Sequence, residues 1–186
     1  MVTLTGSGEL RLAGKPNTIS SGNVVSKIPF TRGVSIEFID RNTNTYYSHS
    51  GFGSGNLQDE LGSTTRWWTT YIPNGYTIGI TASNRLLRIP PGASNVVLDA
   101  PGGYNWYQNT NTNYRHRIQW DSLNNINCYR DNTLVLSATN NVYAAGNKFL
   151  HFTQGEYSDG RGGDRYMDWV FVRKYSVNEP FVSGWG

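Results

Sequence analysis

The chain of 186 residues carries a net charge of +3, and charged residues make up only 16% of it, well below the usual share of about 25%. Its basic residues form no run, which argues against a nucleic-acid partner, and no apolar stretch approaches the roughly 20 residues of a membrane span. Asn, Thr, Ser, Gly and Tyr replace the missing charges, and their uncharged polar groups suit neutral ligands rich in hydroxyl groups.

Short strands separated by turn clusters follow one another along the chain, with almost no helical periodicity. The expected strands are 9–12, 24–30, 33–41, 46–52, 66–72, 76–82, 86–89, 96–98, 114–120, 125–130, 133–138, 149–154 and 167–175. The only helix candidate is a single turn at 57–61. The pattern predicts an all-β fold of two packed antiparallel sheets.

The hairpin near the middle of the second half is the clearest local pattern. Only Asp131 and Asn132 separate strands 125–130 and 133–138, and both residue types tolerate the positive φ angles of a two-residue turn. We therefore expect a tight antiparallel hairpin here.

The last strand has apolar side chains on both faces. Val170 and Val172 alternate with Trp169 and Phe171. A strand with two apolar faces is usually covered on both, so we expect a layer against each face of this strand.

We expect residues 1–176 to form a single domain, since β-sandwiches of this size are common, and residues 177–186 to begin a linker or tail of a longer chain. The only cysteine, Cys128, excludes an intramolecular disulfide and lies in an apolar alternation. It is therefore expected to be a small buried hydrophobe. No signal-peptide pattern opens the chain.

Two segments carry a resemblance to a known superfamily. The run 115–137 resembles the paired strands and hairpin of laminin-G-type modules, with Asp131-Asn132 in place of the usual Asp-Gly. The strand 168–175, followed by Glu179-Pro180, is similar to the ending of sandwich modules in microbial and archaeal surface proteins. Both point to the concanavalin-A-like lectin/glucanase superfamily. The resemblance implies a jelly-roll sandwich and an extracellular or cell-surface location, but this superfamily includes lectins, carbohydrate-binding modules, glycosidases and adhesion domains.

An aromatic loop is the strongest candidate for ligand binding. Tyr104, Asn105, Trp106 and Tyr107 lie between a Gly-Gly pair and an Asn/Thr-rich stretch, where a loop would display them. Sugar rings stack their C–H faces on flat aromatic rings, and amides bind their hydroxyls. One of two adjacent tryptophans, Trp67, is a further candidate, because neighbouring strand residues point to opposite faces.

Polar residues of strand 114–120 are the second part of the predicted site. Arg117 and Gln119 share one face of that strand and could orient sugar hydroxyls. A solvated strand face without a ligand is the alternative interpretation.

The resemblance also implies a possible structural Ca²⁺, which many superfamily members hold through backbone carbonyls and one or two Asp side chains. Asp159 and Asp164 in a glycine-rich loop supply hard oxygen ligands, although Arg161 between them adds a repelling charge. The three histidines, His49, His116 and His151, lack the spacing of a zinc site.

Catalysis has weaker support. Retaining glycosidases need two carboxylates about 5–5.5 Å apart. The nearest match, Glu37 and Asp40, is three residues apart and therefore points to opposite faces of a strand. The sequence favours a non-catalytic carbohydrate-binding module that recognises a polysaccharide by aromatic stacking and hydrogen bonds. Two alternatives stay open: a structural or adhesive module of a cell-surface or viral protein, and a glycoside hydrolase with an unrecognised carboxylate pair.

Overall fold

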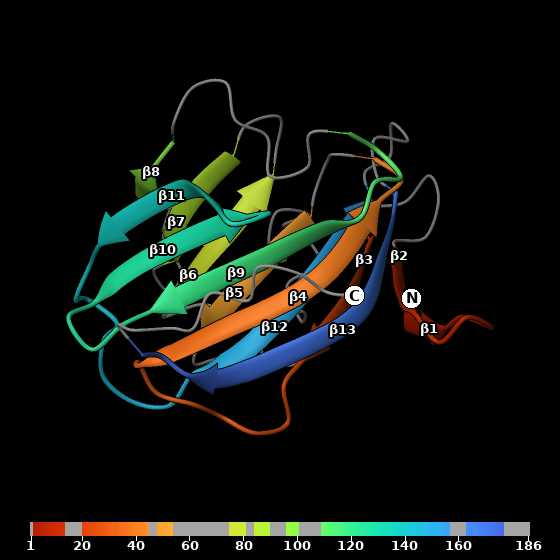
Figure 1. The fold of residues 1–186 in the computed structure, drawn as a ribbon. Coiled ribbons are helices and arrows are strands. Elements are labelled where there is room, and N and C mark those ends of the chain that lie inside the picture. The colour runs from red at the N-terminus through yellow and green to blue at the C-terminus, as the bar shows by residue number, and fades with distance from the viewer. Residues whose placement is uncertain are drawn as a thin grey trace.

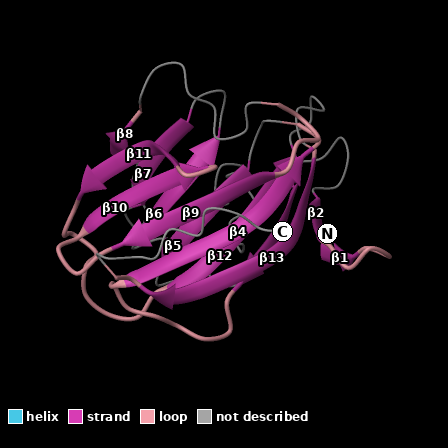
Figure 2. Ribbon diagram, viewed as in Figure 1, coloured by secondary structure: helices cyan, strands magenta, loops and turns pink. Residues whose placement is uncertain are grey.

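A computed structural model describes residues 2–13, 20–44, 48–53, 75–80, 84–89, 96–100, 109–156 and 163–176. Within these ranges the chain forms strands joined by turns and loops, and no α-helix is present (Figure 2). None of the described residues belongs to a helix that could cross a membrane.

Two antiparallel sheets form the layers of the sandwich (Figure 1). The seven-stranded sheet has the order β1-β2-β13-β4-β9-β10-β11. Its strands are β1 (Val2–Leu4), β2 (Leu10–Ala13), β13 (Asp164–Lys174), β4 (Val34–Asn42), β9 (Tyr114–Trp120), β10 (Asn125–Arg130) and β11 (Thr133–Thr139). The six-stranded sheet has the order β3-β12-β5-β6-β7-β8. Its strands are β3 (Ser20–Val25), β12 (Phe149–Glu156), β5 (Ser48–Gly53), β6 (Gly75–Ile80), β7 (Asn84–Ile89) and β8 (Val96–Asp99). The predicted all-β, two-sheet antiparallel fold is confirmed.

An aromatic core joins the two sheets at one end of the sandwich. Trp120 of β9 stacks on Phe52 of β5, with ring centroids 4.8 Å apart and an interplanar angle of 9°. Tyr76 of β6 packs edge-on against Trp120. All three side chains are buried, and each contributes roughly 1.5–3 kcal/mol through burial. Cys128 lies in the same core, as predicted, and burial raises the pKa of its thiol.

The hairpin between β10 and β11 has the predicted two-residue turn. Arg130 pairs with Thr133, and the φ angles of Asp131 and Asn132 are 48° and 67°. Two successive positive φ angles define a type I′ turn, whose twist matches the flanking strands.

Two predictions about strands are wrong. The strand expected at 24–30 is instead β3, which ends at Val25; beyond it, Phe30 makes only an isolated bridge to Lys148. The last strand is not covered on both faces. Val170, Phe171 and Val172 are 43%, 54% and 41% exposed, because β2 pairs with β13 only as far as Met167.

Candidate functional site

Three loops have their bases at one end of the sandwich, where β4 ends and β9 and β13 begin (Figure 1). The amide of Thr43 donates to the carbonyl of Asp164 at 2.9 Å, and the amide of Asp164 donates to the hydroxyl of Thr43 at 2.8 Å. The amide of Asn111 donates to the carbonyl of Asn42 at 2.7 Å. These bonds tie the segments after β4, before β9 and before β13 into one surface, which we call the loop end.

A close backbone approach at the loop end requires glycine. A Cβ atom added at Gly163 would lie 2.7 Å from Cβ of Asn44 and 2.9 Å from the hydroxyl oxygen of Thr43. Any side chain at this position would therefore push the two segments apart. Gly163 is the last glycine of the glycine-rich loop that the sequence singled out.

Tyr114, the first residue of β9, anchors the segment that leads into it. Its hydroxyl accepts a hydrogen bond from the amide of Asn109 at 2.9 Å, and the side chain is buried. The guanidinium of Arg130 lies 5.2 Å from the centroid of its ring. Asn109 follows the predicted aromatic loop 104–107 by only two residues. Its bond to Tyr114 therefore fixes the chain just after that loop.

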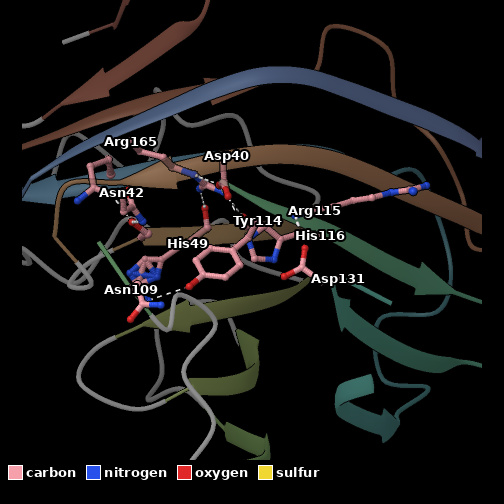
Figure 3. A network of polar contacts seen from close by, with 12 residues as sticks. Asp40, Asn42, His49, Asn109, Tyr114, Arg115, His116, Asp131 and Arg165 are labelled. Carbon is pink, nitrogen blue, oxygen red and sulfur yellow. Dashed lines mark hydrogen bonds and ion pairs between the residues drawn. The ribbon is translucent and has the colours of Figure 1, made fainter. Parts of the chain in front are cut away.

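The interior beneath the loop end is polar, in contrast to the aromatic core at the other end (Figure 3). Arg165 of β13 is 0% exposed and donates to Oδ2 of Asp40 at 2.7 Å, to the carbonyl of His49 at 2.8 Å and to the hydroxyl of Ser50 at 2.6 Å. Its guanidinium also lies 5.1 Å from the ring centroid of Phe152. One side chain thus joins β4, β5 and β12 to its own strand.

Asp40 lies between two basic groups. Nε2 of His116 lies 3.0 Å from Oδ1 of Asp40, and Arg165 occupies the other carboxylate oxygen. Burial lowers the pKa of His116 although Asp40 acts in the opposite direction. The neutral imidazole and the guanidinium together stabilise one buried carboxylate, since an unpaired buried charge would be very costly.

A second buried polar chain runs beside this network. The side-chain amide of Asn42 donates to the hydroxyl of Ser48 at 2.6 Å, and the hydroxyl of Ser48 donates to Oε1 of Gln154. Because Asn42 also accepts from Asn111 through its carbonyl, the interior connects directly to the loop end.

The outer face of the seven-stranded sheet carries a second carboxylate with two cations. Oε2 of Glu37 accepts from Arg115, and Oε1 accepts from Arg173 at 2.8 Å. Burial alone would raise the pKa of Glu37, but the hydrogen bonds from the two arginines outweigh it and lower the pKa.

Of the sequence-predicted polar residues, Arg117 and Gln119 lie on this outer face. Arg117 stacks over Tyr129 of the neighbouring strand at 4.2 Å and is partly exposed. Gln119 is only 6% exposed, so its amide is not displayed as the sequence interpretation required. Arg117 is therefore the better candidate contact of the two.

The predicted contacts of the aromatic loop, Tyr104, Asn105, Trp106 and Tyr107, lie outside the described residues, as do Trp67 and Asp159. Their roles in ligand binding stay predictions. Asp164 is described, and its carboxylate has partners already. Oδ2 accepts from Arg11 at 2.9 Å and from the hydroxyl of Tyr166 at 3.2 Å. A carboxylate neutralised by a guanidinium fits a calcium ion poorly.

The carboxylates of β4 do not form a catalytic pair. Glu37 points outward to two arginines, and Asp40 points into the sandwich, as strand alternation predicts. Within the described residues, no group of three or more His, Cys, Asp or Glu side chains could hold a metal ion.

Sequence reasoning missed Arg165, Asp40, His116 and Tyr114. A signal was present, since Asp40 follows the core residue Phe38 by two positions and so falls on the inward face of β4. The partner of an inward charge, however, comes from a strand 125 residues away, which periodicity cannot identify.

No family model and no curated relative matches the sequence, but the fold matches solved structures. The carbohydrate recognition domain of Emp46p, in its potassium-bound form, aligns with a TM-score of 0.70 and 12% identity over 95% of this chain and 87% of that one. The carbohydrate-binding module CBM66 from Bacillus subtilis aligns with 0.58 and 14% identity over 94% and 91%. A glycoside hydrolase family protein from Mycobacterium thermorestibile aligns with 0.56 and 14% identity over 92% and 79%. The described part of the chain therefore shares the β-sandwich fold of these proteins.

Proposed function

We propose that this chain is a non-catalytic carbohydrate-binding module that recognises a polysaccharide at the loop end. The observation that carries the proposal is the joining of three loop bases above a buried polar interior, through Thr43–Asp164, Asn42–Asn111 and Asn109–Tyr114. Such a base fixes the points where the loops leave the sandwich, and a preorganised site loses less entropy on binding. The likeness to the Emp46p domain and to CBM66 supports the same class of function.

In this proposal Trp106, Tyr104 and Tyr107 stack on sugar rings, with Trp67 as a further platform and Asn105 as a hydrogen-bond partner for hydroxyls. Arg117 and Gln119 lie on β9, the strand that Tyr114 begins. Arg117, already oriented by Tyr129, can donate to hydroxyls of a chain that extends from the loop end over the outer face. Gln119 contributes only if its covered amide becomes accessible.

A structural Ca²⁺ is a separate proposal with a narrower basis. Asp159 would be its main carboxylate, because Arg11 engages Asp164. Loss of polysaccharide retention on addition of EDTA, restored by calcium, would support it. Retention that is unchanged by EDTA would remove calcium from the account and leave the aromatic site intact.

The site assignment is tested by replacing Trp106 with Ala and measuring retention on the polysaccharide that the unmodified chain binds. Loss of a stacked ring should weaken binding roughly tenfold. Leu123→Ala is the matched control, because Leu123 is 74% exposed and lies in the turn at the far end of β9. Equal retention by the Trp106 and Leu123 variants would place the site elsewhere.

A further inference from the structure

Three loops meet at the end of the sandwich opposite the loop end, where β9 ends and β10 begins, at the left in Figure 1. They are residues 26–33 before β4, 121–124 after β9 and 140–148 after β11, and we call them the far end. The guanidinium of Arg32 donates to the side-chain oxygen of Asn124 at 2.9 Å, and the amide of Asn140 donates to the carbonyl of Asn124 at 3.1 Å. Two backbone bonds of 2.8 Å join Phe30 and Lys148. The far end is therefore one connected surface.

Each loop of the far end carries one strongly exposed aliphatic side chain. These are Ile28, Leu123 and Val142, which are 77%, 74% and 53% exposed. Hydrogen-bonded turns fix two of them. A carboxylate oxygen of Asp121 accepts from the amide of Leu123 at 2.8 Å, and the side-chain oxygen of Asn140 accepts from the amide of Val142 at 3.2 Å. The apolar side chains are thus held outward by ordered turns.

Ile28 protrudes because its loop is longer than the segment beside it. The amide of Ser26 donates to the carbonyl of Leu150 at 2.8 Å, and Phe30 forms its bridge to Lys148. Between these two connections one segment has three residues, 27–29, and the other has a single residue. Extra residues on one side of an antiparallel pair have no partner and bulge out of it. Ile28 is the middle residue of this bulge.

The far end is also basic. Lys27 and Arg32 belong to the first of its loops, and both are exposed. Lys174, which is exposed as well, pairs with the first residue of β4 and so lies at the same end. Asp121 is the only carboxylate in the three loops, all of whose residues the structure describes. Its oxygen is already engaged by the turn, so positive charge predominates around the aliphatic side chains.

Exposed aliphatic side chains among cations fit the surface of a membrane. Aliphatic groups insert between lipid headgroups, and Lys and Arg side chains are attracted to anionic lipids. Protein interfaces instead concentrate their binding energy on Trp, Tyr and Arg, and none of the three exposed side chains is aromatic. The composition of the far end therefore favours a lipid surface over a protein partner.

We propose that the far end binds the surface of a membrane that contains anionic lipids. Its three aliphatic side chains lie among the headgroups, and its cations lie against the lipid phosphates. Because β4, β9 and β13 each run from one end of the sandwich to the other (Figure 1), the loop end then points away from the membrane. The inference concerns a different surface from the proposed function and does not depend on it.

The experiment is co-sedimentation of the 186-residue chain with vesicles of phosphatidylcholine alone or of phosphatidylcholine mixed with phosphatidylserine. We expect binding to the mixed vesicles that weakens as NaCl is added. Ile28→Ser combined with Leu123→Ser should weaken binding roughly tenfold or more, because the inserted groups are lost. Leu4→Ser is the matched control, since Leu4 is 75% exposed but lies on β1.

Two results would overturn the insertion of these side chains. One is a folded chain, checked by circular dichroism, that sediments with neither kind of vesicle; the exposed side chains would then belong to a contact with another protein. The other is an equal loss of binding in the Leu4 variant and in the double variant.

The charge of the far end has its own test. Lys27→Glu combined with Lys174→Glu should reduce binding to the mixed vesicles several fold, because both cations lie at the membrane surface. Binding like that of the unmodified chain would overturn the proposed attraction to anionic lipids. Trp106→Ala should leave vesicle binding unchanged, and the far-end variants should retain polysaccharide binding. Failure of this inference is therefore distinguishable from failure of the proposed function.

Discussion

Strand β4 carries two carboxylates three residues apart, and each is held by two basic groups in a different environment. Asp40 lies in the dry interior between Arg165 and His116, whose side chains are all 0% exposed. Glu37 lies on the outer face between Arg115 and Arg173, whose side chains are 22% and 28% exposed. The Glu37 carboxylate is itself only 6% exposed, so the clusters differ mainly in their partners: two partly exposed arginines outside, and one buried arginine with a neutral histidine inside.

Burial changes what removal of a partner should cost. In the interior a carboxylate left unpaired has no water to replace the lost cation, so breaking the pair is expensive. On the outer face water and salt replace much of what an arginine provides. We therefore expect the inner cluster to determine whether the sandwich folds and the outer cluster to adjust its stability only slightly.

The largest expected effect is that of Arg165→Met. The substitution leaves Asp40 charged and buried, and should lower the free energy of unfolding by about 3–5 kcal/mol, measured by urea denaturation. Adding Asp40→Leu should recover much of this loss, because an apolar pair of similar volume needs no charge partner. A loss below about 1 kcal/mol in the single variant would show that the buried Asp40 carboxylate does not depend on Arg165 as its charge partner.

Acid should destabilise the fold through histidines next to this network. Burial lowers the pKa of His49 and of His151 to about 3, against 6.5 in an unfolded chain. The unfolded state therefore binds more protons between pH 6.5 and pH 3, so stability falls as the pH is lowered through this window. The slope should be about 1.4 kcal/mol per pH unit for each histidine.

Urea denaturation at pH 7, 6, 5 and 4 measures this slope. His151→Gln should reduce the slope by about 1.4 kcal/mol per pH unit, the contribution of one histidine. A stability that is flat between pH 6.5 and pH 4 would contradict the buried, neutral state of these side chains.

A substitution in the outer cluster should change the free energy of unfolding only slightly. Glu37→Gln removes the carboxylate shared by Arg115 and Arg173 and should cost about 1 kcal/mol, with the difference between variant and parent shrinking in 1 M NaCl. Because the pKa of Glu37 is lowered, its contribution is present at neutral pH and is lost as the pH falls through the folded-state pKa. A cost equal to that of Arg165→Met would remove the contrast between the two clusters.

The smallest expected effect on stability is that of Tyr114→Phe, which removes the hydroxyl that accepts from Asn109. The cost to folding should be roughly 0.5 kcal/mol. Polysaccharide retention should fall by several fold, because the base of loop 104–107 loses its anchor. Tyr143→Phe is a suitable control, since Tyr143 packs against Tyr76 of the aromatic core and not against the loop base. Unchanged retention in the Tyr114 variant would show that polysaccharide binding does not need the hydrogen bond between Asn109 and Tyr114.

The sequence predicted those features that depend on neighbouring residues. Alternation located β9 and β10 to the residue, and the Asp131-Asn132 turn followed from the φ angles that these two residues tolerate. Local physical chemistry is sufficient for all of these.

Features that depend on pairing across the chain were not predictable in this way. The exposure of Val170 and Val172 follows from the length of β2, which an alternation within β13 does not contain. Likewise Gln119 has the residue type and strand position of a displayed contact but is covered. The polar interior around Arg165 depends on four strands meeting, and only the folded arrangement shows it.

The measurement that tests the central claim most directly is retention of the unmodified chain on insoluble cellulose, chitin, xylan and β-glucan, each compared with an uncoated resin. The account predicts selective retention on at least one of them, released by the matching soluble oligosaccharide. Failure to bind any of the four, with the chain folded by circular dichroism, would contradict the carbohydrate-binding function and favour an adhesive or structural module.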